Sequence, residues 1–248
     1  MVHYDCRGDE QPLSSGHFAA PEVITIDAAD DEQARQMQDV LSGTALTDPD
    51  VMAQFVADCR QRWSTKDDRV AGTLWWYSAS SVVLTALLTR LAEIDLAADP
   101  ALERLRVHVD ADGRIVNAYP GGLLPEVAEL PGALRAALSP VLATLSEVSG
   151  VRLPPLWAIT TDAVANTLLR AWRELGTPAK GVEQASWLVA GMGSPLPAAR
   201  FVELEGKVLV RRVSCCLIDH AGFAACASCP HQEPETRNLR MTAAAQAL

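Results

Sequence analysis

Four cysteines near the carboxyl end form the densest group of metal-binding side chains in this 248-residue chain. Cys215, Cys216, Cys226 and Cys229 follow the spacing C-C-x9-C-x2-C, and a proline comes directly after the last of them. A C-x2-C segment brings two thiolates together on a tight turn, and an adjacent pair at the end of a strand supplies two more. Four thiolates on one loop meet the ligand requirement of a tetrahedral zinc ion or of an iron–sulfur cluster.

The spacing of the cysteines helps to distinguish a zinc site from an iron–sulfur cluster. Structural zinc sites commonly combine two spaced knuckles, and an adjacent C-C pair differs from that pattern. In extended backbone, neighbouring side chains point to opposite sides, so adjacent thiolates reach one ion less easily than a larger two-iron cluster. We therefore favour an iron–sulfur cluster and keep structural zinc and a redox disulfide as alternatives. The βαβ context of a thioredoxin-like C-x2-C motif is missing from the sequence.

Basic residues flank the cysteines and are candidates to surround the ligands. Arg211 and Arg212 precede them on a predicted strand, where alternation turns one side chain inward. That inward arginine would steady an anionic cluster or meet an anionic partner; the alternative is that both are solvated strand charges. His220 and His231 also flank the motif. A mixed histidine–cysteine ligand set is conceivable, but four cysteines already fill a cluster, so His220 is kept as a neighbour of the ligands.

The elements that must position this loop are mostly helical. Apolar residues recur at spacings of three and four, and these stretches predict helices over residues 47–63, 69–93, 134–148, 154–175 and 178–190. Alternation over 105–110 and 115–119, with Gly113 in the turn, predicts a β-hairpin. Strands at 200–204 and 207–213 follow, and the second leads to Cys215. The predicted class is α+β, mostly α: a helical core with an inserted hairpin and a small C-terminal β unit carrying the cysteine loop.

We divide the chain into an acidic N-terminal segment (1–59), a helical domain (60–199), a cluster-binding unit (200–231) and a polar tail (232–248), which we expect to be frayed. Residues 1–58 hold 12 acidic and 2 basic residues and so carry the whole net charge of −10. This segment is interpreted as a solvated leader, with a docking surface for a basic partner as the alternative. The acidic balance argues against sequence-independent binding of nucleic acid.

The sequence also bears on compartment and on cofactors. Residues 70–89 carry no charge and are long enough to span a bilayer, but polar residues dilute them, so we expect a core helix rather than an integral membrane segment. No secretory signal is predicted, which indicates the cytoplasm. Gly191-Met-Gly193 does not continue as G-x-G-x-x-G, and no Walker motif is present. With no nicotinamide, flavin or ATP site predicted, a reductase of this sequence would take electrons from another protein.

The cysteine segment resembles a known family. The run Arg211-Arg-Val-Ser-Cys-Cys-Leu217, then Gly222, then Cys226-Ala-Ser-Cys-Pro230, is similar to the C-terminal end of the FhuF-like ferric-siderophore reductases. That family carries C-C-x10-C-x2-C behind a mostly helical domain, and the resemblance covers about residues 60–230. The middle gap here is one residue shorter than the usual one.

The resemblance implies that Cys215, Cys216, Cys226 and Cys229 bind a [2Fe-2S] cluster. It implies a cytoplasmic enzyme that reduces siderophore-bound Fe(III), hydroxamate complexes among them, and releases Fe(II). The expected partners are a ferric siderophore and an external electron-donor protein. A non-enzymatic protein with structural zinc, or with a sensing iron–sulfur cluster, is the alternative.

Overall fold

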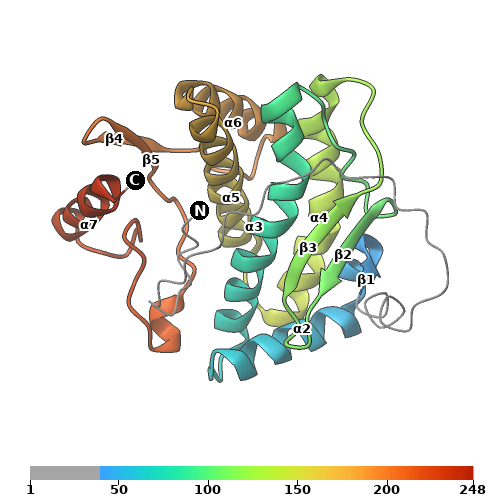
Figure 1. Ribbon diagram of the computed structural model, residues 1–248. Helices are drawn as coiled ribbons and strands as arrows, with labels where there is room; N and C mark the ends of the chain where they lie inside the picture. Colours follow the sequence, from blue (N-terminus) through green and yellow to red (C-terminus); the bar gives the residue numbers. More distant parts are fainter. Residues whose placement is uncertain (1–39, 248) are drawn as a thin grey trace, which may run out of the picture.

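The computed structural model describes residues 40–247, and within them the chain forms six α-helices and five β-strands (Figure 1). The helices are α2 (Pro49–Arg62), α3 (Asp68–Ile94), α4 (Leu130–Ser149), α5 (Leu153–Glu174), α6 (Pro178–Met192) and α7 (Pro234–Gln246). The strands are β1 (Val40–Ser42), β2 (Leu105–Val109), β3 (Ile115–Pro120), β4 (Phe201–Leu204) and β5 (Lys207–Val210). This confirms the mostly helical α+β class.

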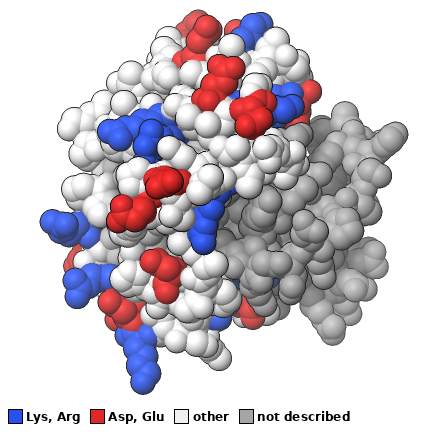
Figure 2. Space-filling view, turned by 90° about the vertical axis from the view of Figure 1, so that its left-hand side faces the viewer, with Lys and Arg blue, Asp and Glu red and all other residues white. Residues whose placement is uncertain are grey.

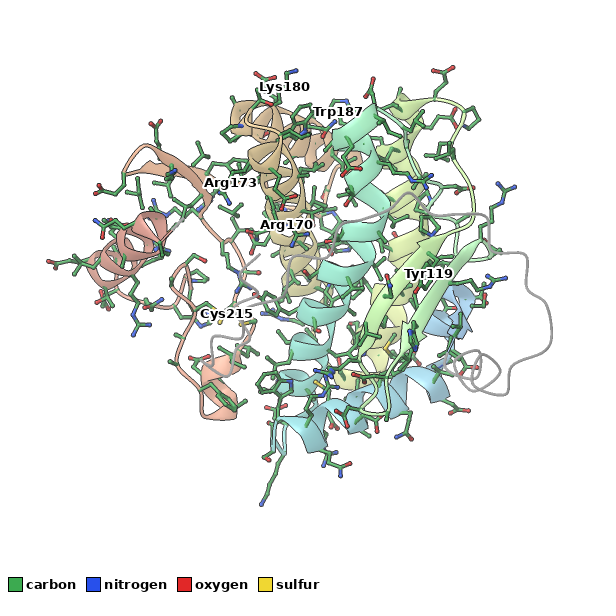
Figure 3. All side chains as sticks on the ribbon, viewed as in Figure 1. Tyr119, Arg170, Arg173, Lys180, Trp187 and Cys215 are labelled. Carbon is green, nitrogen blue, oxygen red and sulfur yellow. The ribbon has the colours of Figure 1, made fainter. Side chains whose placement is uncertain are left out.

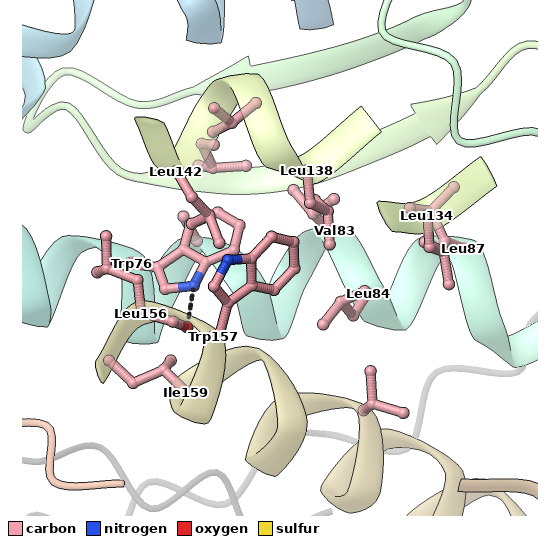
Figure 4. Close-up of a cluster of buried hydrophobic side chains, with 14 of the residues drawn as sticks. Trp76, Val83, Leu84, Leu87, Leu134, Leu138, Leu142, Leu156, Trp157 and Ile159 are labelled. Carbon is pink, nitrogen blue, oxygen red and sulfur yellow. Dashed lines mark hydrogen bonds between the residues drawn. The ribbon is translucent and has the colours of Figure 1, made fainter. Parts of the chain in front are cut away.

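Helix α3 is the centre of the core. It packs against α5 on one side and against β3 on the other, with α2 across its N-terminal end (Figure 1). Trp76 of α3 donates its indole N–H to the Leu156 carbonyl of α5 at 3.1 Å, inside a cluster of buried leucines (Figure 4). Among the described helices, α3 alone is long and apolar enough to cross a bilayer, but 67% of its most apolar window is buried within the protein. It is the core helix that the sequence predicts.

The helix limits agree with the predicted ones to within a few residues, with two informative differences. Helix α2 begins at Pro49 rather than at residue 47. Its N-cap is Asp48, whose carboxylate accepts the N–H groups of Asp50 and Val51. Helix α4 begins four residues earlier than predicted and runs through Pro140. The ring of Pro140 removes one N–H from the helical ladder, but the helix continues to Ser149 because both of its halves bury leucines in the core.

The predicted hairpin belongs to a three-stranded sheet. Strands β2 and β3 pair antiparallel around a turn in which Gly113 has φ +71°, and β1 pairs antiparallel with β2 at the other edge. Strand β1 could not be predicted from the sequence, because three residues are too few to show alternation. The sheet covers the side of α3 that faces away from α5 (Figure 1).

The C-terminal unit, from residue 200 to residue 247, lies on the side of the helical core opposite to the three-stranded sheet (Figure 1). Its hairpin β4–β5 turns through Glu205 and Gly206, which both have positive φ, and Arg173 of α5 donates to the Val208 carbonyl of β5 at 2.7 Å. Strand β5 ends at Val210, earlier than the predicted residue 213. The chain after Val210 is drawn out of the hairpin by hydrogen bonds to α5, described below.

The last residues are not the frayed tail that the sequence suggested. They form α7, which contacts β4 and β5 and buries Met241 and Ala245. The boundaries placed at residues 59, 199 and 231 stay predictions. Helix α2 spans the first of these boundaries and packs on α3 and α4, and the acidic segment before residue 40 lies outside the described residues.

Candidate metal centre

A buried carboxylate on α5 holds the segment that leads into the cysteines. Asp162 is 3% exposed, and its oxygens accept the backbone N–H groups of Val213 and Ser214, each at 2.9 Å, and the Ser214 hydroxyl at 2.5 Å. The last backbone bond of the hairpin runs from the Arg211 N–H to the Arg200 carbonyl at 2.8 Å, and the bonds to Asp162 take the place of further strand pairing. They fix the backbone directly before Cys215 against the helical core.

Arg212 extends this anchor toward the sulfur atoms. It is 6% exposed, its Nε lies 3.6 Å from the Asp162 carboxylate, and its guanidinium stacks over the Tyr77 ring of α3 at 4.6 Å from the centroid. Its Nη1 donates to Cys226 Sγ at 3.6 Å. The inward arginine expected from strand alternation is therefore Arg212, and its neighbour Arg211 is half-buried with no side-chain partner among the described residues.

The surroundings shift the pKa values of both members of this buried pair upward. Burial acts to lower the pKa of Arg212, but Tyr77, Cys216 and Asp162 beside it raise the pKa well above its usual range. Burial raises the pKa of Asp162, and the donors from Ser214, Val213 and Arg212 oppose that shift. The donors around Asp162 favour its carboxylate form, whereas burial, the larger effect, favours the protonated form.

The four thiols meet as two pairs. Cys215 Sγ lies 3.6 Å from Cys229 Sγ, and Cys216 Sγ lies 3.5 Å from Cys226 Sγ. Each cysteine of the adjacent C-C pair thus joins one cysteine of the C-x2-C segment, and the two neighbours face different partners. This separation agrees with the expectation that adjacent thiolates reach a single ion less easily than a two-iron cluster.

This arrangement suits a two-iron cluster better than one zinc ion. In a tetrahedral site with Zn–S bonds of about 2.3 Å, all six sulfur–sulfur distances are about 3.8 Å. Within the described residues, no three of these cysteines have sulfur atoms that all lie within 4.8 Å of one another. A [2Fe-2S] cluster needs two close sulfurs at each iron and a longer separation between the pairs, so the donor set fits it.

The thiols also differ in acidity. Cys226 donates to Cys216 and, with Arg212 beside it, lowers the pKa of Cys216 to about 5 against the effect of burial. Burial raises the pKa of Cys215 to about 12, and the nearby Cys229 adds to this rise. Cys59 is fully buried in the core, where desolvation raises its pKa to about 11, as expected of a cysteine that serves as a small apolar residue.

Local backbone and side-chain contacts shape the loop that carries the cysteines. Leu217 and Gly222 adopt positive φ on either side of the short helix η3 (Ile218–Ala221), and Phe223 packs edge-on against Trp63 at the end of α2. Gln232 donates to the Cys226 carbonyl at 2.6 Å, and Arg240 of α7 donates to the Ala225 carbonyl at 3.0 Å. The start of the C-x2-C turn is therefore held by Gln232 and by α7.

One edge of the site reaches the surface. Cys215 is half-buried and lies between the C-terminal unit and the helical core (Figure 3). His231 is exposed, and one of its ring nitrogens lies within 4.8 Å of the sulfur atoms of Cys215 and Cys229. Acidic and basic side chains are interspersed on the face that looks out from this part of the molecule (Figure 2). His220 is also exposed and makes no side-chain hydrogen bond among the described residues.

Sequence reasoning identified the cysteines and Arg212 but missed the residues that hold Arg212. Asp162 and Tyr77 lie on helices that are distant from Arg212 in the sequence. Asp162 precedes Arg212 by 50 residues and Tyr77 precedes it by 135. The sequence feature that could have identified Asp162 is its position: it is an acidic residue on the buried face of α5, next to Thr160 and Thr161. Trp75 and Trp76, the neighbours of Tyr77 on α3, are buried in the hydrophobic core.

Comparison with known proteins agrees with this geometry. Residues 212–231 match the family model of the FhuF 2Fe-2S C-terminal domain. The matched segment contains all four paired cysteines and begins at Arg212. No curated protein matches the chain. The cofactor of the cysteine loop is therefore a [2Fe-2S] cluster; that each of the four cysteines is a ligand stays a prediction.

Proposed function

We propose that this chain, whose cysteine loop is a FhuF-type [2Fe-2S] domain, is a ferric-siderophore reductase that acts in the cytoplasm. The observation that carries the proposal is the family match over residues 212–231, in which the thiols stand as two close pairs. The helical layout ahead of the cysteines agrees with the same family resemblance.

The chemistry requires one electron and no bond cleavage in the siderophore. A siderophore holds Fe(III) through hard oxygen donors, and Fe(II) is bound by those donors far less tightly. One electron added to the bound Fe(III) therefore releases the metal as Fe(II). The [2Fe-2S] cluster, when bound, supplies that single electron.

The residues of this chain would hold the cluster and control its surroundings. Asp162 fixes the backbone before the cysteines, and Arg212 places a positive charge beside their sulfurs. The half-buried Cys215 and the exposed His231 leave one edge open, so a ferric complex or an electron donor can approach without entering the core. Burial and hydrogen bonds around the sulfurs set the reduction potential.

The electron donor is proposed to be another protein. The sequence contains no dinucleotide or flavin fingerprint, so we do not expect the chain to oxidise NADH or NADPH unaided. The substrate is a ferric siderophore, with hydroxamate complexes as the first class to test. The family resemblance implies a cytoplasmic enzyme, and cysteine thiolates that bind a cluster stay reduced in that compartment.

The direct test follows reoxidation of the reduced protein. Protein reduced with dithionite and freed of excess reductant is mixed in a stopped-flow instrument with a panel of ferric hydroxamates, catecholates and carboxylates, with a ferrous chelator present. The proposal predicts rapid return of the oxidised spectrum with at least one complex, and one chelated Fe(II) for each cluster oxidised.

The alternative is a non-enzymatic four-cysteine protein, with structural zinc or with a cluster that senses. Stoichiometric zinc in a colourless protein would favour the structural form. Full cluster occupancy without reoxidation by any ferric complex would favour the sensing form and would contradict the proposal.

A further inference from the structure

The two sulfur pairs lie in different electrostatic surroundings. Arg212 donates to Cys226 Sγ at 3.6 Å and also interacts with Cys216, which receives the Ile218 N–H as well. The other pair receives one backbone donor, the Leu217 N–H, which lies 3.3 Å from Cys215 Sγ. Among the described residues, no hydrogen bond joins Arg212 to Cys215 or Cys229. The pair formed by Cys216 and Cys226 thus has a buried guanidinium beside it. The side chain beside Cys215 and Cys229 is the exposed imidazole of His231, which lies in contact with water.

The position of this cation is fixed by its other contacts. The Nε end of Arg212 faces the Asp162 carboxylate, Nη2 donates to Ser214 Oγ at 3.3 Å, and the plane stacks on Tyr77. The Nη1 end is left pointing at the sulfur of Cys226. The guanidinium therefore touches the carboxylate through Nε and the sulfur of Cys226 through Nη1, each at 3.6 Å.

We propose that Arg212, which stands beside the sulfurs of Cys216 and Cys226 and not beside the other two, would make the iron held by Cys216 and Cys226 the one reduced when a [2Fe-2S] cluster is bound. Reduction turns one Fe(III) of the cluster into Fe(II) and leaves the other as Fe(III). The added negative charge is stabilised most at the iron closest to a cation, and more so where burial excludes water and salt. Hydrogen bonds to the sulfurs act in the same direction.

The first test compares two arginines that are adjacent in the chain. Arg212→Gln and Arg211→Gln remove the same charge, but the Arg211 side chain has no partner among the described residues. In spectroelectrochemical titrations of the cluster-loaded protein, the midpoint potential should fall in Arg212→Gln by about twice the fall in Arg211→Gln or more, since Coulomb energy varies inversely with distance and dielectric constant. Arg212→Lys, which keeps the charge, should restore most of the difference. Equal shifts in the two glutamine variants would overturn the proposal.

The second test needs no variant and decides the matter if Arg212→Gln does not fold. In proton NMR spectra of the reduced native protein, the cysteine β-CH2 signals on Fe(II) and on Fe(III) have opposite temperature dependence. Assignment through Overhauser effects to Leu217 and Ile218 separates the pairs. Cys216 and Cys226 should show the Fe(II) behaviour, and its appearance at Cys215 and Cys229 would overturn the proposal. Neither test uses a siderophore, so the outcome is independent of the reductase assignment.

Discussion

The Asp162 carboxylate is the point at which the helical core meets the cysteine loop. It satisfies two backbone N–H groups and one hydroxyl of residues 213 and 214, and it faces Arg212. A buried ion pair of this kind contributes little net stability, but loss of one partner leaves an uncompensated charge and costs about 3–5 kcal/mol. The role of Asp162 is therefore to fix the geometry of the loop.

Single serine substitutions test the ligand set. Cys215→Ser, Cys216→Ser, Cys226→Ser and Cys229→Ser should each lower iron and acid-labile sulfide per chain, because each removes one soft thiolate from a pair. Cys59→Ser is the matched control, since Cys59 is fully buried in the helical core and should leave both contents intact. Normal iron and sulfide in any of the four variants would remove that cysteine from the ligand set.

Individual site residues can be predicted from the sequence where they belong to a local pattern. The C-C and C-x2-C spacings predicted the cysteine group and the opposite orientation of Cys215 and Cys216. The contact of Asp162 with Val213 spans 51 residues, and no local periodicity reports such a contact. The same holds for Tyr77, which the sequence marks only as one more aromatic residue of an apolar helix.

Among the elements, the helices with strong apolar periodicity were predictable and the weakly patterned ones were not. Helices α3 and α5 bury continuous apolar faces, and their limits follow from the sequence. Helix α7 buries only Met241 and Ala245 among its thirteen residues, so its amphipathic signal is faint. Its position depends on β4 and β5, which are contacts that only the folded chain provides.

The packing of α7 against the rest of the protein can be tested by comparing one buried and one exposed apolar residue of this helix. Met241 is 2% exposed and Leu239 is 68% exposed. Met241→Ala should lower the free energy of unfolding of the C-terminal unit by about 2 kcal/mol and speed the loss of iron to a chelator, because it leaves a cavity against the hairpin. Leu239→Ala should change neither quantity. Equal effects of the two substitutions in urea titrations and chelation kinetics would contradict this packing.

The turn between β2 and β3 carries an acid-sensitive contact. Burial acts to raise the pKa of Asp110, but the N–H and guanidinium of Arg114 and the N–H of Asp112 outweigh it and lower the pKa. The pKa of the folded state is then below the unfolded value of about 3.9, so the stabilisation is complete above that pH and is lost as the pH falls through the folded value. Asp110→Asn should cost about 1 kcal/mol at neutral pH.

The measurement is urea unfolding of both proteins from pH 7 down to pH 2. The difference in free energy of unfolding between the native protein and Asp110→Asn should shrink as the acid protonates Asp110. Asp112→Asn is the control, because Asp112 is exposed in the same turn. A difference that stays constant over the whole range would show that the charge of Asp110 is not involved.

At the scale of the whole molecule, most of the hydrophobic core belongs to the helices and the three-stranded sheet. The buried residues run almost continuously from Leu46 to Met192, and only Val210, Cys216 and Ile218 join this core from the C-terminal unit. A chain of this size buries enough surface to fold without a metal. The cluster is therefore expected to order the cysteine loop rather than the helical core.

Removal of the cluster tests this division. The protein without iron, prepared by chelation under reducing conditions, should retain most of its far-UV circular dichroism, since α2 to α6 do not depend on the thiols. Protease should cut preferentially after residue 210 in this form. Loss of the helical signal would show that the core and the cluster unit fold as one.

The claim on which the rest depends is that the paired thiols hold two irons. The most direct measurement is the Mössbauer spectrum of protein loaded with iron-57, before and after one-electron reduction. The account predicts two thiolate-bound Fe(III) sites that are coupled to a diamagnetic state, and then one Fe(II) and one Fe(III) in equal amounts. A single mononuclear iron site, or a protein that binds zinc and excludes iron, would contradict it.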